Sequence, residues 1–309
     1  MKKCTVFILF FILFSFLSAE KMVVRINQPS EDTFRDFWSN NFDIASYKPG
    51  EFLDLVVDEQ QYEELSQKHN MKIMQIEQQL INNLSSGKDL NHYRNYDEVL
   101  AELEALEEDY PEICKLYNIG DTQGKIYAEE GHSFYNDYNH EIWALKVSDN
   151  VEMEEDEPGI YYLGVHHSRE PLSCEVAMSN LLYIIENYGT DATITDNVDN
   201  SQIWFVPLVN PNGHKVVWDE TDVWWRKNIR DNNNNHTFDT DYYNGSGDDG
   251  VDVNRNYGWE WGLVGASDNI NDPTYHGPEA FSEPETMAIK NLMTEHHFVA
   301  GISYHTYLW

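Results

Sequence analysis

The chain has 309 residues, of which 41% are hydrophobic and 14% aromatic. This is enough apolar surface for one sizeable globular domain and a smaller one, and it excludes wholesale disorder. Lys and Arg number 20 against 54 Asp and Glu, so the formal net charge is −34 at pH 7. A field of this sign repels phosphate backbones and anionic lipid surfaces, so we expect neither nucleic acid nor a membrane as a partner.

The first nineteen residues have the layout of a secretory signal peptide. Lys2 and Lys3 precede an apolar run over residues 6–14, which continues to Leu17-Ser18-Ala19 and turns polar at Glu20. About a dozen apolar residues are too few to span a bilayer, which takes about 20, and small residues stand where cleavage would occur. We therefore expect residues 1–19 to be a signal and the product to be secreted or lumenal. A short anchor or a buried terminal helix is the alternative.

Residues 20–90 are predicted to form a small α+β domain. Strands are predicted at residues 22–26, 52–57 and 71–76, and helices from Glu31 and over residues 59–68. A polar stretch rich in Asn, Ser and Gly follows at residues 82–95 and indicates a domain boundary. A protease that cuts after basic residues could enter there, which makes the domain a candidate propeptide with an activating protease as partner. An ordinary accessory domain is the alternative.

From residue 91 to the end, helices alternate with apolar strands. A helix is predicted from Tyr96 to Pro111, and further helices at residues 172–188 and 283–295. The predicted strands are residues 142–147, 160–165, 203–209 and 298–304. Continuous apolar strands separated by helices predict an α/β fold with a mixed, mostly parallel central sheet and helices on both faces. In such open sheets the ligand site lies beyond the carboxyl ends of the strands.

The last helix has a recognisable start. In Ser282-Glu283-Pro284-Glu285 the hydroxyl stands where an N-cap is expected, with Pro in the first turn and Glu three residues after Ser282. The pattern predicts a capping box, which explains Glu283 and Glu285 without a catalytic role.

The cysteines allow two arrangements. Cys4 lies in the predicted signal peptide, which leaves Cys114 and Cys174. These two could form one disulfide or remain as buried thiols, and the sequence does not decide between them.

Three potential metal ligands follow predicted strands. His167 and Glu170 come directly after the strand at residues 160–165, and His305 follows the strand at residues 298–304. Two His and one carboxylate leave the fourth zinc position for a water molecule, whose pKa zinc lowers. About one His-x-x-Glu pair is expected by chance in so acidic a chain, and His276 with Glu279 is a second pair, but it lies in a loop with no strand before it. Histidines that are hydrogen-bonded at strand ends, without metal, are the alternative.

Six ordered motifs resemble those of the zinc carboxypeptidases, of the carboxypeptidase A, B and T kind. They are His167-Ser168-Arg169-Glu170, Asn210-Pro211-Asn212-Gly213, Trp225-Arg226-Lys227-Asn228, Asp252-Val253-Asn254-Arg255-Asn256, Tyr275-His276-Gly277-Pro278 with Phe281 to Glu285, and Ser303-Tyr304-His305-Thr306-Tyr307. The resemblance extends from about Tyr93 to the last residue, and the segment before Asn82 resembles the family's activation propeptide more loosely.

The resemblance implies a role for each matching residue. It implies that one Zn²⁺ ion is bound by three ligands, His167, Glu170 and His305. A catalytic role is implied for Arg226, and substrate contacts are implied for Arg169, Asn254, Arg255 and Tyr307. Among these, Arg226 would polarise the scissile carbonyl and hold the developing oxyanion, and Asn254 and Arg255 would bind the free C-terminal carboxylate of a peptide or protein, Arg255 by its bidentate fork. Arg169 and Tyr307 would contact residues further from the chain end. Without the family, Arg226 beside Trp224 and Trp225 could equally be a stacked structural Arg.

The chain also departs from the family's pattern. His166 stands where an apolar residue is usual, and Pro171 replaces the commoner Trp. An insertion at residues 231–250 is rich in Asn and Asp, and its oxygens could hold Ca²⁺, although it lacks the full spacing of a calcium loop. A solvated loop is the favoured interpretation of this insertion, and calcium binding is the alternative.

The chain ends four residues after His305, whereas the family continues with further sheet, a substrate-capping Tyr and a general-base Glu. We therefore expect this sequence to be truncated at its C-terminus. The favoured hypothesis is a secreted zinc metallocarboxypeptidase precursor, which hydrolyses the C-terminal peptide bond of peptides and proteins. The alternative is a catalytically inactive protein that binds zinc and peptide C-termini without turnover.

Overall fold

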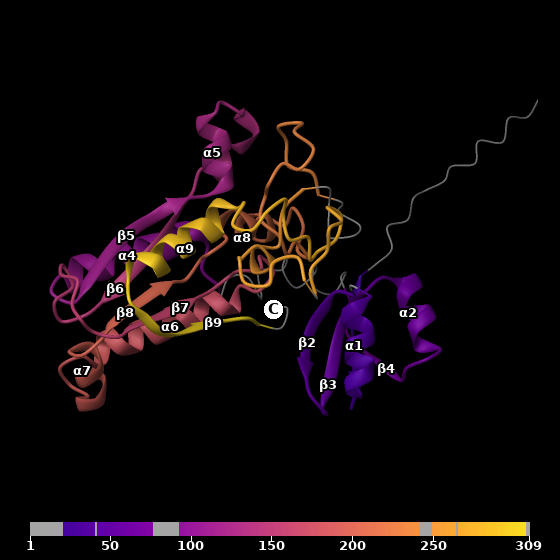
Figure 1. Ribbon diagram of the computed structural model, residues 1–309, viewed down its shortest axis with the longest axis horizontal. Helices are drawn as coiled ribbons and strands as arrows, with labels where there is room; N and C mark the ends of the chain where they lie inside the picture. The colour runs from indigo at the N-terminus through magenta and orange to yellow at the C-terminus, as the bar shows by residue number, and fades with distance from the viewer. Residues whose placement is uncertain (1–20, 41, 77–92, 241–248, 264, 307–309) are drawn as a thin grey trace, which may run out of the picture.

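A computed structural model describes residues 21–40, 42–76, 93–240, 249–263 and 265–306. The chain forms a small N-terminal unit, drawn in indigo in Figure 1, and a larger unit that holds the remaining helices and strands. The predicted signal peptide, residues 82–92 of the predicted linker, and Tyr307 lie outside the described residues.

The N-terminal unit is an antiparallel sheet with two helices. Its elements are β1 (Met22–Asn27), α1 (Glu31–Ser39), β2 (Ile44–Lys48), β3 (Phe52–Val57), α2 (Glu59–Ser66) and β4 (Met71–Ile76). The strand order is β2-β3-β1-β4. Both helices begin at a side-chain cap: Ser30 accepts the N–H of Thr33, and Asp58 forms a capping box with Gln61. The elements predicted for this unit are confirmed, and β2 is an additional strand.

The larger unit contains a five-stranded mixed sheet. Its elements are α4 (Tyr96–Asp109), β5 (Cys114–Asp121), α5 (Gln123–Glu129), η2 (Ser133–Tyr138), β6 (Glu141–Val147), β7 (Gly159–Leu163), α6 (Leu172–Asn187), α7 (Ala192–Val198), β8 (Gln202–Val206), α8 (Pro211–Trp218), η3 (Val253–Arg255), α9 (Pro284–Glu295) and β9 (Phe298–Ser303). The order is β5-β6-β8-β7-β9. The mixed α/β sheet is confirmed. Among the described strands, however, β5–β6 and β6–β8 pair antiparallel and only β8–β7 and β7–β9 pair parallel.

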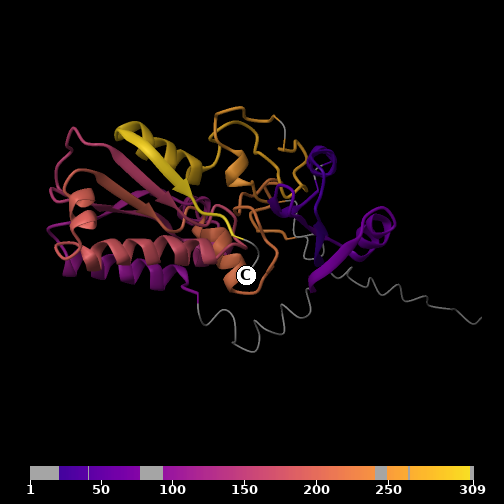
Figure 2. The same cartoon turned by 90° about the horizontal axis from the view of Figure 1, so that it is seen from below.

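Helices cover both faces of this sheet, as predicted. Figure 2 shows α9 on one side of the strands and α6 with α4 on the other. On the α4 and α6 side, Leu103 and Met178 pack into the first core, and on the α9 side Ile289 packs with Trp204 into the second. Among the described residues, no helix combines the length and the apolar character needed to cross a membrane.

The register between β7 and β9 sets the position of His305. Leu163 pairs with Ser303, and Tyr161 pairs with Gly301. The ring of Tyr161 lies against the backbone of Gly301. A Cβ atom added at position 301 would lie only 2.0 Å from Tyr161 Cζ. A larger residue at position 301 would therefore move the ring or the strand.

The first core also settles the state of the cysteines. Cys114 on β5 and Cys174 on α6 are both fully buried in it. Both are free thiols. Of the two arrangements left open by the sequence, the structure therefore has the buried thiols.

The predicted cap of α9 is wrong. Glu283, not Ser282, is the N-cap, and it makes no side-chain cap hydrogen bond. Instead, Ser282 Oγ donates to Glu283 Oε1 at 2.7 Å, and Arg230 Nη1 donates to the same oxygen at 3.0 Å. Burial and the charge of Glu283 raise the pKa of the fully buried Glu285 to about 7. The carboxyl groups of Glu283 and Glu285 therefore have a structural role, as predicted. They contact neighbouring loops, however, and do not cap the helix.

Candidate metal centre and substrate site

The turn after β7 positions His167 and Glu170. Ser173 Oγ accepts the N–H of Val165 at 2.9 Å and donates to the Glu170 carbonyl at 2.6 Å, so one hydroxyl joins both ends of the turn. Val165 has a φ of 49°, a conformation that a β-branched residue rarely adopts. The buried strand and α6 on either side hold this strained turn in place.

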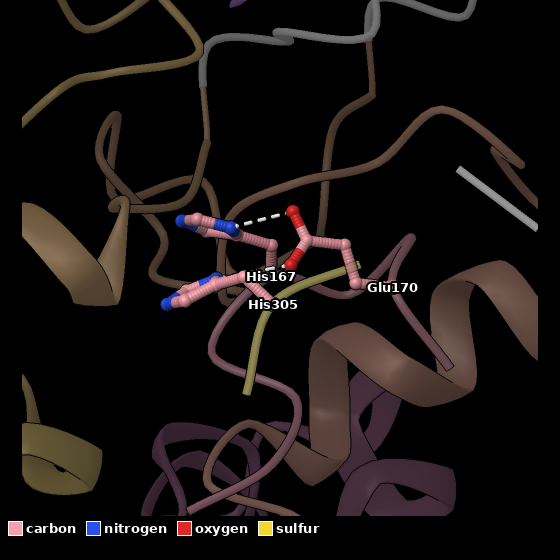
Figure 3. Close-up of side chains that lie close together, drawn as sticks. All are labelled: His167, Glu170 and His305. Carbon is pink, nitrogen blue, oxygen red and sulfur yellow. Dashed lines mark hydrogen bonds and ion pairs between the residues drawn. The ribbon is translucent and has the colours of Figure 1, made fainter. Parts of the chain in front are cut away.

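Three side chains converge at the carboxyl ends of β7 and β9, as Figure 3 shows. His167 Nδ1 lies 2.8 Å from Glu170 Oε1, and His305 Nδ1 lies 3.0 Å from Glu170 Oε2. Ligand atoms of these residues lie within 4.8 Å of one another. Tetrahedral zinc ligands at about 2.1 Å from the ion are about 3.4 Å apart, so small shifts would let all three contact one ion. The donor set and its spacing therefore fit zinc.

The charges within this group are strongly coupled. Glu170 is almost fully buried, and burial alone would raise its pKa. The charges and hydrogen bonds of His167 and His305 outweigh burial and hold the pKa of Glu170 well below its usual range. Glu170 is therefore a carboxylate with both oxygens directed at imidazole nitrogens, which suits it to a cation.

Asp252 links the metal ligands to Arg226. Its Oδ1 lies 3.3 Å from His167 Nε2, and its Oδ2 accepts from Arg226 Nε at 2.9 Å. Asp252 is fully buried, which alone would raise its pKa, but Arg226, His167 and Arg255 together outweigh burial and hold the pKa well below the usual range. A carboxylate behind a ligating imidazole fixes the orientation of the ring. Sequence reasoning gave Asp252 no role, although it begins one of the quoted motifs.

His166, the departure from the family's pattern, lies beside the metal ligands. Its Nε2 is 2.8 Å from the hydroxyl of Tyr257, and its Nδ1 is 3.1 Å from Ser303 Oγ. Ser303 Oγ in turn lies 3.3 Å from His305 Nε2. Burial lowers the pKa of His166 to about 3, so the ring is neutral. The extra histidine therefore belongs to a hydrogen-bonded chain that ends on a metal ligand.

The structure also places the predicted substrate arginines. Arg226 is buried and paired with Asp252, whereas the cation over the Trp225 ring is Lys227, at 5.5 Å. Arg255 donates through Nε to the Gly265 carbonyl at 2.6 Å and through Nη1 to the Asn254 carbonyl at 3.2 Å. The Asn254 amide reaches the metal ligands, since its Nδ2 lies 3.4 Å from His305 Nε2.

The N-terminal unit lies against these arginines. Asp43 accepts two hydrogen bonds from Arg169, at 2.7 and 2.5 Å. The ring of Trp38 lies 5.6 Å from the guanidinium carbon of Arg255. A cavity of about 60 Å³ remains between the units, with Trp38, Asp43, Arg226 and Arg255 among its lining residues. Of the residues predicted to contact substrate, Arg169 and Arg255 are therefore engaged by the N-terminal unit.

The calcium site predicted for residues 231–250 is not supported. Asp231 accepts backbone N–H groups of Asn235 and His236, at 3.3 and 2.8 Å. Asp249 accepts those of Asn232 and Asp239, at 2.9 and 2.7 Å. These carboxylates shape the loop through its own backbone, and residues 241–248 lie outside the described residues.

Comparison with known proteins decides the family. The family model described as zinc carboxypeptidase matches residues 99–308. The chain belongs to the zinc carboxypeptidase family. The matched residues include the three converging side chains, Asp252 and all the predicted substrate arginines, so these residues lie within the segment that matches the family.

Individual relatives agree with this assignment. A zinc carboxypeptidase of Saccharothrix mutabilis subsp. capreolus is 32% identical over 177 residues, which cover 56% of this chain and 34% of the relative. Carboxypeptidase B of Astacus astacus is 29% identical over 228 residues, which cover 72% of this chain and 64% of the relative. The chain therefore spans less than two thirds of the length of either relative.

Solved structures establish the same fold. Carboxypeptidase A from Helicoverpa armigera matches with a TM-score of 0.72 at 20% identity, over 94% of this chain and 70% of that one. Thrombin activatable fibrinolysis inhibitor matches with a TM-score of 0.68 at 18% identity, over 94% of this chain and 72% of that one.

Proposed function

We propose that the protein is a zinc-dependent metallocarboxypeptidase that hydrolyses the C-terminal peptide bond of peptides and proteins. The observation that carries this proposal is the convergence of His167, Glu170 and His305 beside the Asp252–Arg226 pair. Family membership supports the reaction class.

In this proposal His167, Glu170 and His305 hold one zinc ion. Zinc bound there would supply a Lewis acid and a water molecule of lowered pKa. The Asp252 carboxylate lies 3.3 Å from His167 Nε2 and the Ser303 hydroxyl 3.3 Å from His305 Nε2, and from these positions they would orient the two rings when zinc is bound. The protein's own contribution at this centre is therefore a ligand geometry held by a second layer of polar groups.

Arg226 and Arg255 are proposed to supply positive charge to two different groups of the substrate. Arg226 is fixed by Asp252 and buried, which suits it to stabilise negative charge developing on a carbonyl oxygen. Arg255 has a guanidinium fork that can bind the terminal carboxylate of a peptide in a bidentate manner, with the Asn254 amide as a further donor. Carboxylate binding by Arg255 would select a free chain end as substrate.

The N-terminal unit is proposed to be an inhibitory propeptide. Asp43 presents a carboxylate to Arg169, and Trp38 covers Arg255, so acidic and aromatic groups occupy the place of a substrate. Val23 and Val56 add an apolar contact with Val223 and Trp224 of the larger unit. We expect activation by a protease that cuts within residues 82–95, and export through the predicted signal peptide.

The test compares the intact protein with protein cleaved between the units. The zinc-loaded cleaved protein should hydrolyse a blocked dipeptide with a free carboxylate, and a chelator should abolish that activity. The intact protein should be much less active. Arg226→Gln should lower kcat, because it removes the proposed oxyanion contact, while the zinc content stays unchanged.

One result would favour the alternative, a non-catalytic binding protein. In that case the cleaved protein would bind one zinc ion and a peptide with a free C-terminus but would release no amino acid. Equal activity of the intact and the cleaved protein would instead remove the propeptide proposal and leave the peptidase proposal standing.

A further inference from the structure

One basic residue of the predicted linker is held firmly by the larger unit. Lys88 and Arg94 are the Lys and Arg residues of positions 82–95, and the structure describes Arg94. Its Nε and Nη2 donate to the two oxygens of Glu102 on α4, at 2.6 and 3.3 Å. Its Nη1 pairs with Glu175 in the first turn of α6. The Arg94 side chain is only 29% exposed, and its guanidinium joins two helices of the larger unit.

The backbone around Arg94 is engaged as well. The N–H of Arg94 donates to Glu175 Oε1 at 2.7 Å, and its carbonyl accepts from His214 Nε2 on α8 at 3.0 Å. The N–H of Asn95 donates to Glu98 Oε2 at 2.9 Å, within the capping box that begins α4. The peptide bond between Arg94 and Asn95 therefore has both its carbonyl and its N–H hydrogen-bonded.

These contacts oppose cleavage after Arg94. A protease that cuts after a basic residue takes that side chain into its own pocket and binds the flanking backbone in an extended form. At Arg94 this would separate the ion pairs with Glu102 and Glu175 and unwind the start of α4, which costs charge-assisted hydrogen bonds and a helix cap. Where opening and closing are fast, the rate of proteolysis follows the fraction of molecules in which the segment is open. The contacts of Arg94 keep that fraction small.

We propose that Arg94, Glu102 and Glu175 form a latch that protects the Arg94–Asn95 bond from the activating protease. Cleavage between the units then falls N-terminal to Arg94, and the larger unit keeps this residue after activation. The protection follows from the contacts of Arg94, whereas its place in activation rests on the proposed propeptide function.

Keeping Arg94 preserves the support behind the metal ligands. Glu175 lies five residues after Glu170, and its two oxygens bind the N–H and the guanidinium of Arg94. A cut after Arg94 would place a new carboxylate beside Glu102 and Glu175, and these like charges would repel. The first turn of α6, which follows the turn with His167 and Glu170, would then lose its anchor. The latch therefore separates removal of the N-terminal unit from damage to the metal centre.

Limited digestion with trypsin tests the latch on the zinc-loaded full chain. Fragment masses should show cuts N-terminal to Arg94, and the folded protein should give no large fragment that begins at Asn95. The heat-unfolded chain should be cut after Arg94, which shows that the bond itself is a trypsin substrate. In the double substitution Glu102→Gln with Glu175→Gln, cleavage after Arg94 should be about tenfold faster or more, because the open segment is more populated.

The double substitution Glu104→Gln with Glu186→Gln is the matched control. These exposed glutamates lie on the same two helices, α4 and α6, and the change in net charge is the same. The control should be cut after Arg94 as slowly as the unsubstituted protein. If the variant of Glu102 and Glu175 does not fold, Glu102→Gln alone replaces it. This change weakens one of the two ion pairs and should accelerate the cut about threefold.

Two results would overturn the proposal. One is a large fragment that begins at Asn95 and forms from the folded, unsubstituted protein as fast as any upstream cut. The other is an unchanged rate of cleavage after Arg94 in the latch variant. Because the readout is a fragment mass, the proposed function is tested separately. Digestion that spares the Arg94–Asn95 bond but releases no peptidase activity supports the latch and counts against the proposed function.

Discussion

Asp43→Asn removes the charge that holds the N-terminal unit on Arg169. The two oxygens of Asp43 accept from the two terminal nitrogens of Arg169, and the side chains are 14% and 2% exposed, respectively. Burial alone would raise the pKa of Asp43, but Arg169, with a smaller effect of Arg226, holds it below its usual value. The carboxylate is therefore charged and paired while the units are docked.

The cost of the substitution can be estimated from this geometry. Truncating one partner of a buried, hydrogen-bonded charge pair costs about 2–5 kcal/mol. The remaining exposure of Asp43, and the oxygen that Asn retains, place the change in the lower part of that range, at about 2–3 kcal/mol. At about 1.4 kcal/mol per tenfold change, docking should weaken by about 30- to 150-fold.

A binding assay measures this without relying on turnover. The docked unit covers Arg255, so the intact protein should bind a fluorescent peptide with a free C-terminal carboxylate only when the unit is displaced. Its apparent Kd equals the intrinsic Kd divided by the open fraction. Asp43→Asn should therefore tighten the apparent Kd by the factor above, up to the value of the cleaved protein, as measured by fluorescence anisotropy.

Asp32→Asn is the control, because Asp32 is an exposed residue of α1 and the charge change is the same. It should leave the peptide affinity unchanged. Equal affinities for Asp43→Asn and the unsubstituted protein, together with tight binding by the cleaved protein, would refute the assigned role of the Asp43–Arg169 pair.

Arg255→Lys keeps the charge but loses the bidentate fork. It should therefore weaken peptide binding to the cleaved protein at least tenfold without changing the zinc content. Equal losses of peptide affinity and zinc content would contradict the proposed binding of the terminal carboxylate by Arg255. Glu285 has a folded pKa of about 7 against 4.5 for the ordinary group, so stability should fall as the pH rises through this interval, by about 3 kcal/mol. The free energy of unfolding, measured by urea denaturation, should be lower at pH 8 than at pH 5 in the unsubstituted protein. The difference should be smaller in Glu285→Gln. His166→Leu should lower zinc affinity by about 10- to 100-fold in competition with a chromophoric chelator, because it removes the partner of Ser303; unchanged affinity would exclude the network.

The fold was predictable where a strand is a continuous apolar run and not where the run is broken. The strands β6, β7 and β8 are continuous apolar runs and were predicted from them. Two of the four edge strands, β2 and β5, were missed, whereas the edge strands β4 and β9 were predicted. The side chains of β2 and β5 are mostly half-buried, so their sequences carry no unbroken apolar run. The pairing across each sheet, which the local sequence does not encode, is what forms them.

The candidate site, too, was predictable only in part. His167, Glu170 and His305 were identified because each follows an apolar strand and matches a quoted motif. Asp252 and Asp43 were not identified, because each acts on a partner that is distant in sequence: Asp252 contacts Arg226, and Asp43 contacts a residue 126 positions away. A single sequence offers no local signal for such pairs.

The pairing of β9 with β7 also determines when the metal centre can form. Glu170 and His305 are separated by 135 residues in the chain, yet they lie 3.0 Å apart once β9 is in register. Closing so long a segment costs conformational entropy before any ligand contact is gained, and contacts of this range slow folding. During synthesis, a chain that has already folded its N-terminal unit still lacks the last ligand. High-affinity zinc uptake would therefore report that β9 has paired with β7, and Gly301, which contributes no ligand atom, would assist this pairing by leaving room for the ring of Tyr161.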